Sequence, residues 1–486
     1  MPYLLALAGA ALSVLAFPPF GAWPLAVIGP ALWLSGLARV ERSGQGAGVG
    51  FVFGLAFFGG LIWWLSELGW EALVPLVVVQ AVYPGLFGWV MVRWVRGRSG
   101  HRWWMVAAGV WAVLEFVRYR FPVSGFEWGA WGYALSDLQA ARAAARWVGT
   151  TGLTVLVMAA ASGLATLAMR VAAVPVGLLA AALAFGALLP NLPEGEAVPV
   201  AIVQGSTPCP FEHCENERFR TYQQHLELTR TIDPGTVDLV VWSEGSTGSV
   251  DADPINAPEV GEAISAEAAR IDAWMLVGGD RPISETHWIN AVVGFAPSGQ
   301  IVGEYRKQHP VPFGEYIPAR PLFEWIPALD QVPRDMIPGE GAVVFDLGGY
   351  SVGTVISFEG GFSRYARQMV DAGADLLVVA TNEGSYGTTP ASDQFIGMTR
   401  MRAAETGHDL IHAAVTGKSA IITDGGVVGQ TTGLGTMEVL YGEVQPRPGL
   451  QTVYVRLGDW LMLLAVVGAA ALWIRSHFGG VGSGDV

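Results

Sequence analysis

The stretch LPNLPEGEAVPVAIVQG, residues 189–205, lies where the 486-residue chain changes from membrane-like to water-soluble sequence. Long apolar runs precede it, and short β-branched runs separated by amphipathic and turn-rich segments follow it. Residues 1–189 contain 11 Arg and six acidic residues, a net charge of +5, whereas residues 190–486 contain 17 basic and 36 acidic residues, a net charge of −19. Because 52% of all residues are hydrophobic and only 14% are charged, the composition indicates a membrane protein and excludes a small soluble domain.

The apolar runs predict transmembrane helices, each of which needs about 17–25 residues to cross the hydrocarbon core. About eight runs have this character: residues 3–20, 22–38, 48–66, 72–95, 103–119, 147–170, 172–189 and 458–475. Thirteen of the 19 Trp residues precede residue 190, as expected for indoles at a bilayer interface. We therefore expect a membrane domain of about seven helices at 1–189, a second domain at 190–457, a final helix at 458–475 and a tail at 476–486.

The arginines predict the orientation, because short cytoplasmic loops collect positive charge. One side of the predicted topology carries Arg39, Arg42, Arg93, Arg96, Arg98, Arg102, Arg170 and Arg475. This pattern places both chain ends in the cytoplasm and residues 190–457 outside the cytoplasmic membrane. Residues 118–146 argue against it, since they carry Arg118, Arg120, Arg142 and Arg146 on the predicted outer side.

Residues 190–457 read as an α/β domain. Runs such as DLVVWSEG (238–245), YSVGTVISF (350–358) and DLLVVATNEG (375–384) are typical of buried strands. Helical patterns lie among them at 215–231, 257–271, 362–373 and 391–406. This alternation predicts a layered α/β domain inserted before the final span. Its net charge excludes a nucleic-acid partner, because it would repel phosphate backbones.

Three chemically capable side chains follow predicted strands, where the sites of α/β domains usually lie. Glu244 ends DLVVWSEG, Lys307 lies in EYRKQHPVPFGEYIP (304–318) and Ser357 ends YSVGTVIS. The chain has only two lysines against 26 arginines, which favours a role for Lys307 that needs an amine. The structural alternatives are an N-cap or solvated turn for Glu244, a surface cation for Lys307 and a helix cap for Ser357.

Only two cysteines occur, Cys209 and Cys214, so no disulfide framework holds the fold. With His213 they offer three soft ligands, whereas a structural zinc site usually has four. We therefore expect no metal and no cofactor. A local disulfide and two free thiols both remain open.

The order of motifs resembles the apolipoprotein N-acyltransferases over nearly the whole chain. The motifs are AFPPFGAWPL (16–25), WSEGS (242–246), YRKQHPVPFGEYIP (305–318), VISFEGGF (355–362), ATNEGSYG (380–387) and RMRAAETG (400–407), with a final single span. The resemblance implies an eight-helix membrane domain that carries an extracytoplasmic nitrilase-like domain, a four-layer αββα sandwich. It also implies transfer of an acyl chain from a phospholipid to the N-terminal diacylglyceryl-cysteine of an apolipoprotein.

The resemblance further implies a catalytic triad. Glu244 matches the general base, Lys307 matches the residue that stabilises the oxyanion, and Ser357 stands where the family has its nucleophilic Cys. Glu315 and Glu359 match two supporting glutamates. Two further departures are Phe358 in place of Tyr, and Tyr386 in a segment that often carries Trp.

A serine at position 357 changes the chemistry, because a thiol near pKa ~8.5 ionises readily and a hydroxyl must lose its proton during attack. Three explanations fit: a Cys-to-Ser replacement in a working enzyme, a natural serine variant, or a relative that has lost the reaction. The functional alternatives are therefore a slow or impaired acyltransferase that still binds its substrates, and a membrane-anchored amide hydrolase that uses the same residues.

Overall fold

The computed structural model describes residues 1–95, 102–211, 214–248, 253–323, 325–423 and 425–478. Arg96, Arg98 and His213, which entered the predictions of orientation and metal binding, lie outside the described residues. The chain divides into two compact units. One comprises Met1–Pro190 with Thr452–Val486, and the other comprises Asn191–Gln451. The α/β unit thus ends at Gln451, six residues before the boundary predicted from the sequence.

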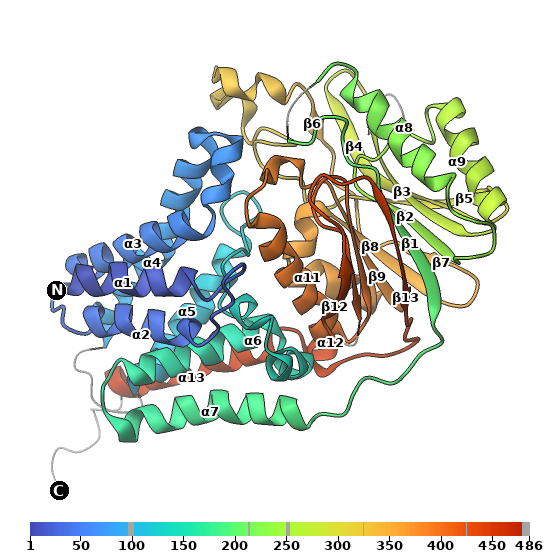
Figure 1. The fold of residues 1–486 in the computed structure, drawn as a ribbon. Coiled ribbons are helices and arrows are strands. Elements are labelled where there is room, and N and C mark those ends of the chain that lie inside the picture. Colours follow the sequence, from blue (N-terminus) through green and yellow to red (C-terminus); the bar gives the residue numbers. More distant parts are fainter. Residues whose placement is uncertain (96–101, 212–213, 249–252, 324, 424, 479–486) are drawn as a thin grey trace, which may run out of the picture. The chain divides into compact units, whose positions relative to one another are not determined.

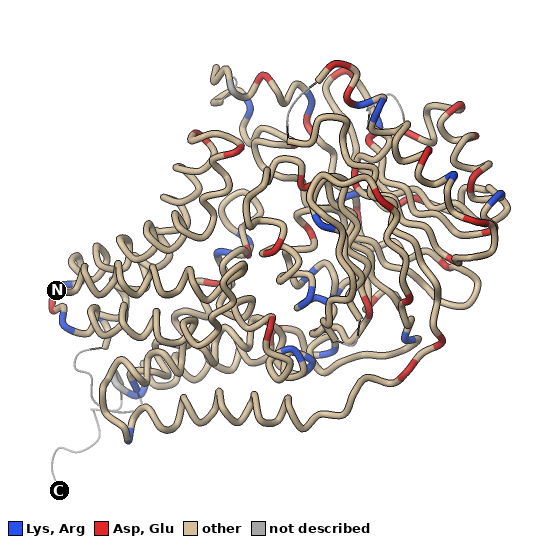
Figure 2. Tube along the Cα trace, viewed as in Figure 1, with Lys and Arg blue, Asp and Glu red and all other residues tan. Residues whose placement is uncertain are grey.

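The first unit is helical (Figure 1). Its helices are α1 (Pro2–Val14), α2 (Leu25–Leu37), α3 (Ser43–Leu61), α4 (Trp70–Trp94), α5 (Arg102–Arg118), α6 (Gln139–Leu164), α7 (Met169–Leu188), α12 (Val453–Leu457) and α13 (Trp460–Phe478), with the short helices η1 (Trp63–Leu68) and η2 (Tyr133–Leu135). Among the described residues, four helices are long and apolar enough to cross a membrane: α3, α4, α6 and α7. Helices α1 and α2 and the segment Trp460–Arg475 are apolar but shorter. Few charged residues interrupt these helices (Figure 2).

Small and aromatic side chains pack the helical unit. A Cβ atom at Gly50 of α3 would lie 1.9 Å from the carbonyl oxygen of Pro84 in α4, so glycine permits this close approach. Trp33 stacks on Phe53 with ring centroids 4.2 Å apart, and Phe57 stacks on Trp131 at 4.9 Å. Close contact of this kind replaces the hydrophobic driving force that helices lack within lipid.

The second unit contains two sheets (Figure 1). The first has the order β13 (Glu438–Val444), β1 (Val198–Gln204), β2 (Leu239–Trp242), β3 (Trp274–Pro282), β4 (His287–Phe295), β5 (Ile301–Arg306), with β6 (Asp335–Met336) paired to β4. The second has the order β12 (Val427–Thr431), β11 (Ala420–Thr423), β10 (Leu410–Ala414), β9 (Leu376–Thr381), β8 (Ser351–Ile356), β7 (Val344–Asp346). Each sheet has a parallel centre, β1-β2-β3 or β8-β9-β10, flanked by antiparallel strands.

Helices cover the outer faces of both sheets (Figure 1). On the first sheet, α8 (Glu217–Thr229) and α9 (Pro258–Ile271) bury Leu226 and Ile264 in one core cluster with Trp242. On the second, α10 (Ser363–Asp371) contacts β8, and α11 (Ala391–Thr406) contacts β10. Between the sheets, Gln204 Oε1 accepts hydrogen bonds from the hydroxyls of Ser419 at 2.7 Å and Thr432 at 2.6 Å. The predicted α/β sandwich is confirmed, because β-branched strands buried on both faces need helices outside and a second sheet inside.

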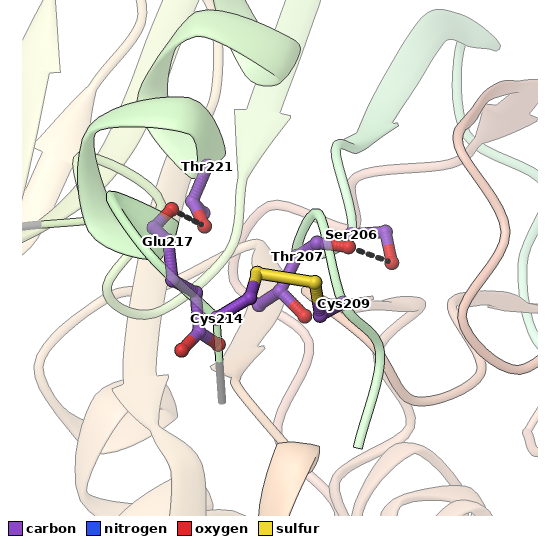
Figure 3. Close-up of a disulfide and its surroundings, with 6 residues drawn as sticks. All are labelled: Ser206, Thr207, Cys209, Cys214, Glu217 and Thr221. Carbon is purple, nitrogen blue, oxygen red and sulfur yellow. Dashed lines mark hydrogen bonds between the residues drawn. A yellow bond between two sulfur atoms is a disulfide. The ribbon is translucent and has the colours of Figure 1, made fainter. Parts of the chain in front are cut away.

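The two cysteines form a disulfide (Figure 3). Cys209 and Cys214 lie five residues apart, with 6.1 Å between their Cα atoms. Nearby, the Thr221 hydroxyl donates to the carbonyl oxygen of Glu217 at 2.9 Å in the first turns of α8. The structure thus settles the choice between a local disulfide and two free thiols in favour of the disulfide.

Candidate active site

The three predicted catalytic residues all follow strands of the α/β unit. Glu244 lies two residues after β2, and Lys307 follows β5 directly. Ser357 follows β8 directly and is the first residue of the short helix η6 (Ser357–Gly361). It does not cap α10, which begins at Ser363. Sequence reasoning about strand ends therefore located all three positions correctly along the fold.

Lys307 is buried between two carboxylates. Its side chain is fully enclosed, with Nζ 2.6 Å from Glu315 Oε1 and 3.1 Å from Glu244 Oε1. Burial by itself would lower the pKa of Lys307, but the charges of Glu244 and Glu315 outweigh it and raise the pKa above its ordinary value. Lys307 is therefore a fixed ammonium group, suited to stabilising negative charge and unsuited to accepting a proton.

Each carboxylate is held in place by further donors. Glu244 Oε1 accepts from Asn290 Nδ2 at 2.7 Å, and its Oε2 accepts from the Asn382 N–H at 3.0 Å. Glu315 Oε2 accepts from the Val311 N–H at 2.7 Å. Burial raises the pKa of Glu315, and the neighbouring Lys307 limits the rise. Glu315, which the resemblance matches to a supporting glutamate, thus pairs with Lys307.

Ser357 occupies a sharp turn. Its φ of 51° lies in the left-handed region, which is uncommon for a residue other than glycine. A strand that ends in such a turn and leads into a helical turn exposes the side chain and leaves nearby N–H groups free to face an oxyanion. This geometry favours a nucleophile at position 357.

Glu359 ties the Ser357 turn to the Lys307 loop. Its Oε2 accepts from the Ile356 N–H at 2.7 Å and from the Tyr305 hydroxyl at 2.8 Å. Its Oε1 accepts from the N–H groups of Gln308 at 2.5 Å and His309 at 3.0 Å. Burial raises the pKa of Glu359 to about 7, and these donors with Lys307 limit the rise. Glu359 thus fixes the backbone of the two segments that carry Ser357 and Lys307.

Tyr386 lies in the turn η7 (Gly384–Tyr386), which follows β9. Burial, with the charges of Glu383 and Glu244, raises the pKa of its hydroxyl well above the ordinary value. Tyr386 therefore stays a neutral phenol, close enough to Glu244 and Glu383 for their charges to act on it.

Three residues that sequence reasoning did not single out complete the site. Asn290 and Asn382 hold Glu244, and Asp280 lies close enough for the charges of Glu244 and Glu315 to act on it. Asn382 belongs to the quoted ATNEGSYG motif, whereas nothing in the linear sequence marks Asn290 or Asp280. Among the described residues, no group of His, Cys, Asp and Glu side chains is arranged to hold a metal.

Two family descriptions match the chain: "Apolipoprotein N-acyltransferase N-terminal domain" over residues 9–163 and "Carbon-nitrogen hydrolase" over residues 199–448. An apolipoprotein N-acyltransferase of Geobacter metallireducens is 30% identical, covering 97% of this chain and 94% of that protein. The chain belongs to the apolipoprotein N-acyltransferase family. A second apolipoprotein N-acyltransferase, from Photobacterium profundum, is 28% identical, covering 94% of this chain and 91% of that protein.

The apolipoprotein N-acyltransferase family assignment confirms the predicted fold class, a multi-span helical membrane domain with a carbon-nitrogen hydrolase domain of the nitrilase type. Among solved structures, a carbon-nitrogen hydrolase from Helicobacter pylori G27 is similar with a TM-score of 0.41 and 15% identity, covering 59% of this chain and 97% of that one. The family match and the apolar helices together make the chain a membrane protein of an acyltransferase family.

Proposed function

We propose that this chain N-acylates apolipoproteins, with a phospholipid as acyl donor and the α-amino group of the N-terminal diacylglyceryl-cysteine as acceptor. The observation that carries the proposal is the buried Lys307, held by Glu244 and Glu315 and tied through Glu359 to the Ser357 turn. The relatives named above bear the name of this activity.

The first half-reaction forms an acyl-enzyme. Glu244 takes the hydroxyl proton of Ser357 while Oγ attacks the acyl ester of the phospholipid. The Lys307 ammonium group and backbone N–H groups of the turn stabilise the negative charge that develops on the carbonyl oxygen. The ester bond then breaks, Glu244 returns the proton to the leaving oxygen, and a lysophospholipid departs.

The second half-reaction transfers the acyl chain to nitrogen. The acceptor amine attacks the acyl carbon, a C–N bond forms, and the bond to Ser357 Oγ breaks. Glu244 carries a proton from nitrogen to that oxygen, which regenerates the hydroxyl. Because an oxyester is a poorer acyl donor than a thioester, we expect slower turnover than with Cys at position 357. No step needs a metal or a diffusible cofactor.

We further propose that residues 1–189 and 458–475 anchor the chain in the cytoplasmic membrane of a bacterium, with the catalytic domain 190–457 outside and the tail 476–486 inside. The disulfide supports this side, since disulfides persist in oxidising compartments. Two arginines that argued against the orientation are buried. Arg118 Nη1 donates to the carbonyl oxygens of Phe126 and Trp128, and Arg142 Nη1 donates to that of Ser136. Both arginines bind backbone carbonyl groups of the segments that follow them. They therefore do not count among the exposed loop charges from which the orientation is predicted.

Intact-protein mass spectrometry tests the proposal. The purified chain and its Ser357→Cys and Ser357→Ala variants are incubated in detergent with phosphatidylethanolamine, and a fatty-acyl mass gain is measured. We expect the gain with Ser or Cys at position 357 and no gain with Ala. A gain with Cys alone would identify Ser357 as a block in a competent scaffold, and no gain in any form would refute the triad.

An acylated form is then mixed with a diacylglyceryl-cysteine lipopeptide. Transfer of the acyl chain to the lipopeptide supports the acyltransferase, whereas release of free fatty acid supports the alternative of a membrane-anchored hydrolase.

A further inference from the structure

Asp280 lies on β3, next to the strand β2 that precedes Glu244, the proposed catalytic base. Side chains alternate along β3, and the next residue, Arg281, pairs with Asp253 at 3.4 Å, so Asp280 points to the opposite face. The antiparallel partner of Asp280 is Asn290, whose Nδ2 donates to Glu244 Oε1 at 2.7 Å. Directly paired residues share a face, with Cβ atoms about 4.5–5.5 Å apart. Asp280 therefore lies on the Glu244 side of the sheet.

Two acceptor oxygens on this pair accept no hydrogen bond. Asp280 Oδ1 and Asn290 Oδ1 are both buried and have no donor among the described residues. Asn290 is only 3% exposed, and its amide nitrogen is already engaged by Glu244. Leaving a buried polar group unpaired is costly in free energy, so this position is suited to a ligand that brings N–H donors.

We propose, on the basis of the function proposed above, that Asp280 binds the α-amino group of the acceptor and takes one of its protons, with Asn290 Oδ1 as the second acceptor. An α-amino group has a pKa of about 7.7–8.0, so much of it is ammonium at neutral pH and has no lone pair for attack. As the ammonium group binds, Asp280 releases its own proton to water, and one ammonium proton then moves to the resulting Asp280 carboxylate. The freed lone pair then forms the C–N bond, and a second proton passes through Glu244 to Ser357 Oγ, which leaves Asp280 protonated as it was before the amine bound.

The charges around Asp280 suit this role. Burial and the carboxylates of Glu244 and Glu315 raise the pKa of Asp280 to about 8, while Lys307 and Arg218 act in the opposite direction. A carboxyl group whose pKa matches that of the amine exchanges a proton with it at little free-energy cost. Glu244 alone would have to accept both protons of the ammonium in succession, and Asp280 supplies the additional site.

Binding to a chain that cannot react tests recognition. The Ser357→Ala chain in detergent is titrated with a diacylglyceryl-cysteine lipopeptide that has a free α-amine, and with its N-acetylated form. We expect the free amine to bind at least about tenfold more tightly, since hydrogen bonds to charged groups contribute about 1.5–3 kcal/mol. Adding Asp280→Asn should abolish this preference, whereas the surface variant Asp371→Asn should keep it.

Single-turnover transfer tests the proton step. Acyl-enzyme made in the Ser357→Cys background is mixed with the lipopeptide or with hydroxylamine, which is already neutral at pH 7. Asp280→Asn should slow transfer to the lipopeptide by about 100-fold or more and leave hydroxylamine cleavage unchanged. Equal slowing of both reactions, or an amine preference that survives Asp280→Asn, would overturn the inference while leaving the proposed function intact. If no acyl-enzyme forms at all, the proposed function fails, and the binding titration still decides whether Asp280 recognises the amine.

Discussion

The two lysines of the chain allow a comparison between a buried ion pair and a partly exposed one, because each lysine can be replaced by Met in turn. Lys307 Nζ lies 2.6 and 3.1 Å from two carboxylates, and its side chain is fully enclosed. The second lysine, Lys418, pairs with Asp393 at 2.5 Å, but the two side chains are 29% and 38% exposed. Because these are the two lysines of the chain, Lys307→Met and Lys418→Met form a matched pair of variants.

The two substitutions should differ in magnitude. Removing one partner of a buried pair costs about 3–5 kcal/mol, because the remaining charge stays buried without compensation. An exposed pair contributes about 0–1 kcal/mol. We therefore expect the free energy of unfolding of the α/β unit to fall by about 3–5 kcal/mol for Lys307→Met and by less than about 1 kcal/mol for Lys418→Met.

The pH dependence identifies the cause. Burial already raises the pKa of Glu315, and the Lys307 charge limits that rise, so Lys307→Met should raise this pKa further. A carboxyl group whose pKa is higher in the folded state than in the unfolded state lowers the free energy of unfolding as pH rises and the group ionises. At low pH, where the group is protonated in both states, this loss disappears. The loss in Lys307→Met should thus be larger at pH 8 than at pH 5.

Pulse proteolysis of the full-length chain in urea, at both pH values, measures this difference by cleavage within residues 191–451. Equal losses for the two lysine variants, or a Lys307→Met loss independent of pH, would contradict the assignment of Lys307 as a buried counter-ion.

Three further predictions follow from other contacts. Glu359→Ala removes the acceptor of three N–H groups and the Tyr305 hydroxyl, so it should destabilise the α/β unit by more than about 3 kcal/mol, given about 1–3 kcal/mol for each buried donor left unpaired; urea titration measures this, with the exposed Glu285→Ala as control. Reduction of the Cys209–Cys214 disulfide should lower stability by about 2 kcal/mol, since the closed loop is short, and a Cys209→Ser/Cys214→Ser chain should show no effect of reductant. Burial, and to a smaller extent the charges of Glu244 and Glu315, raises the pKa of Asp280 from 3.8 to about 8. Its ionisation therefore lowers the free energy of unfolding progressively as pH rises from 3.8 to about 8. Asp280→Asn should therefore flatten the decline of stability across that range, and an unchanged profile would show that Asp280 does not carry it.

Local sequence patterns predicted the elements of the α/β unit well. The helical patterns at 215–231, 257–271, 362–373 and 391–406 correspond to α8, α9, α10 and α11 with ends that differ by at most two residues. The i, i+3 spacing of Arg402 and Glu405 predicts an ion pair, which the structure contains at 3.0 Å. These features depend on residues close in sequence, where periodicity and turn residues carry the information.

Contacts between distant strands could not be predicted from periodicity. Asp280 and Asn290 come together only because β3 and β4 pair in one register, and a shift of either strand by one residue would turn its side chain away from Glu244. The pairing of Lys307 with Glu315 spans eight residues of irregular backbone, which has no repeating pattern to read. The catalytic roles of Glu244, Lys307, Ser357, Glu315, Glu359 and Tyr386 stay predictions, now with a defined arrangement.

The energetics of the site favour a chemical role over a structural one. Well-packed apolar side chains in place of a buried ion pair are often neutral or stabilising by about 1–4 kcal/mol, so stability alone gives no reason to enclose Lys307 with two carboxylates. The left-handed backbone at Ser357 adds strain of about 1–3 kcal/mol, and Glu359 braces this turn by accepting a hydrogen bond from the Ile356 N–H. A protein that merely bound lipids would need neither feature. Both features fit the proposed mechanism, in which attack by Ser357 creates an oxyanion that the Lys307 ammonium group stabilises. The arrangement around Ser357 therefore supports the proposal of an acyltransferase with a slower nucleophile over that of a relative that has lost the reaction.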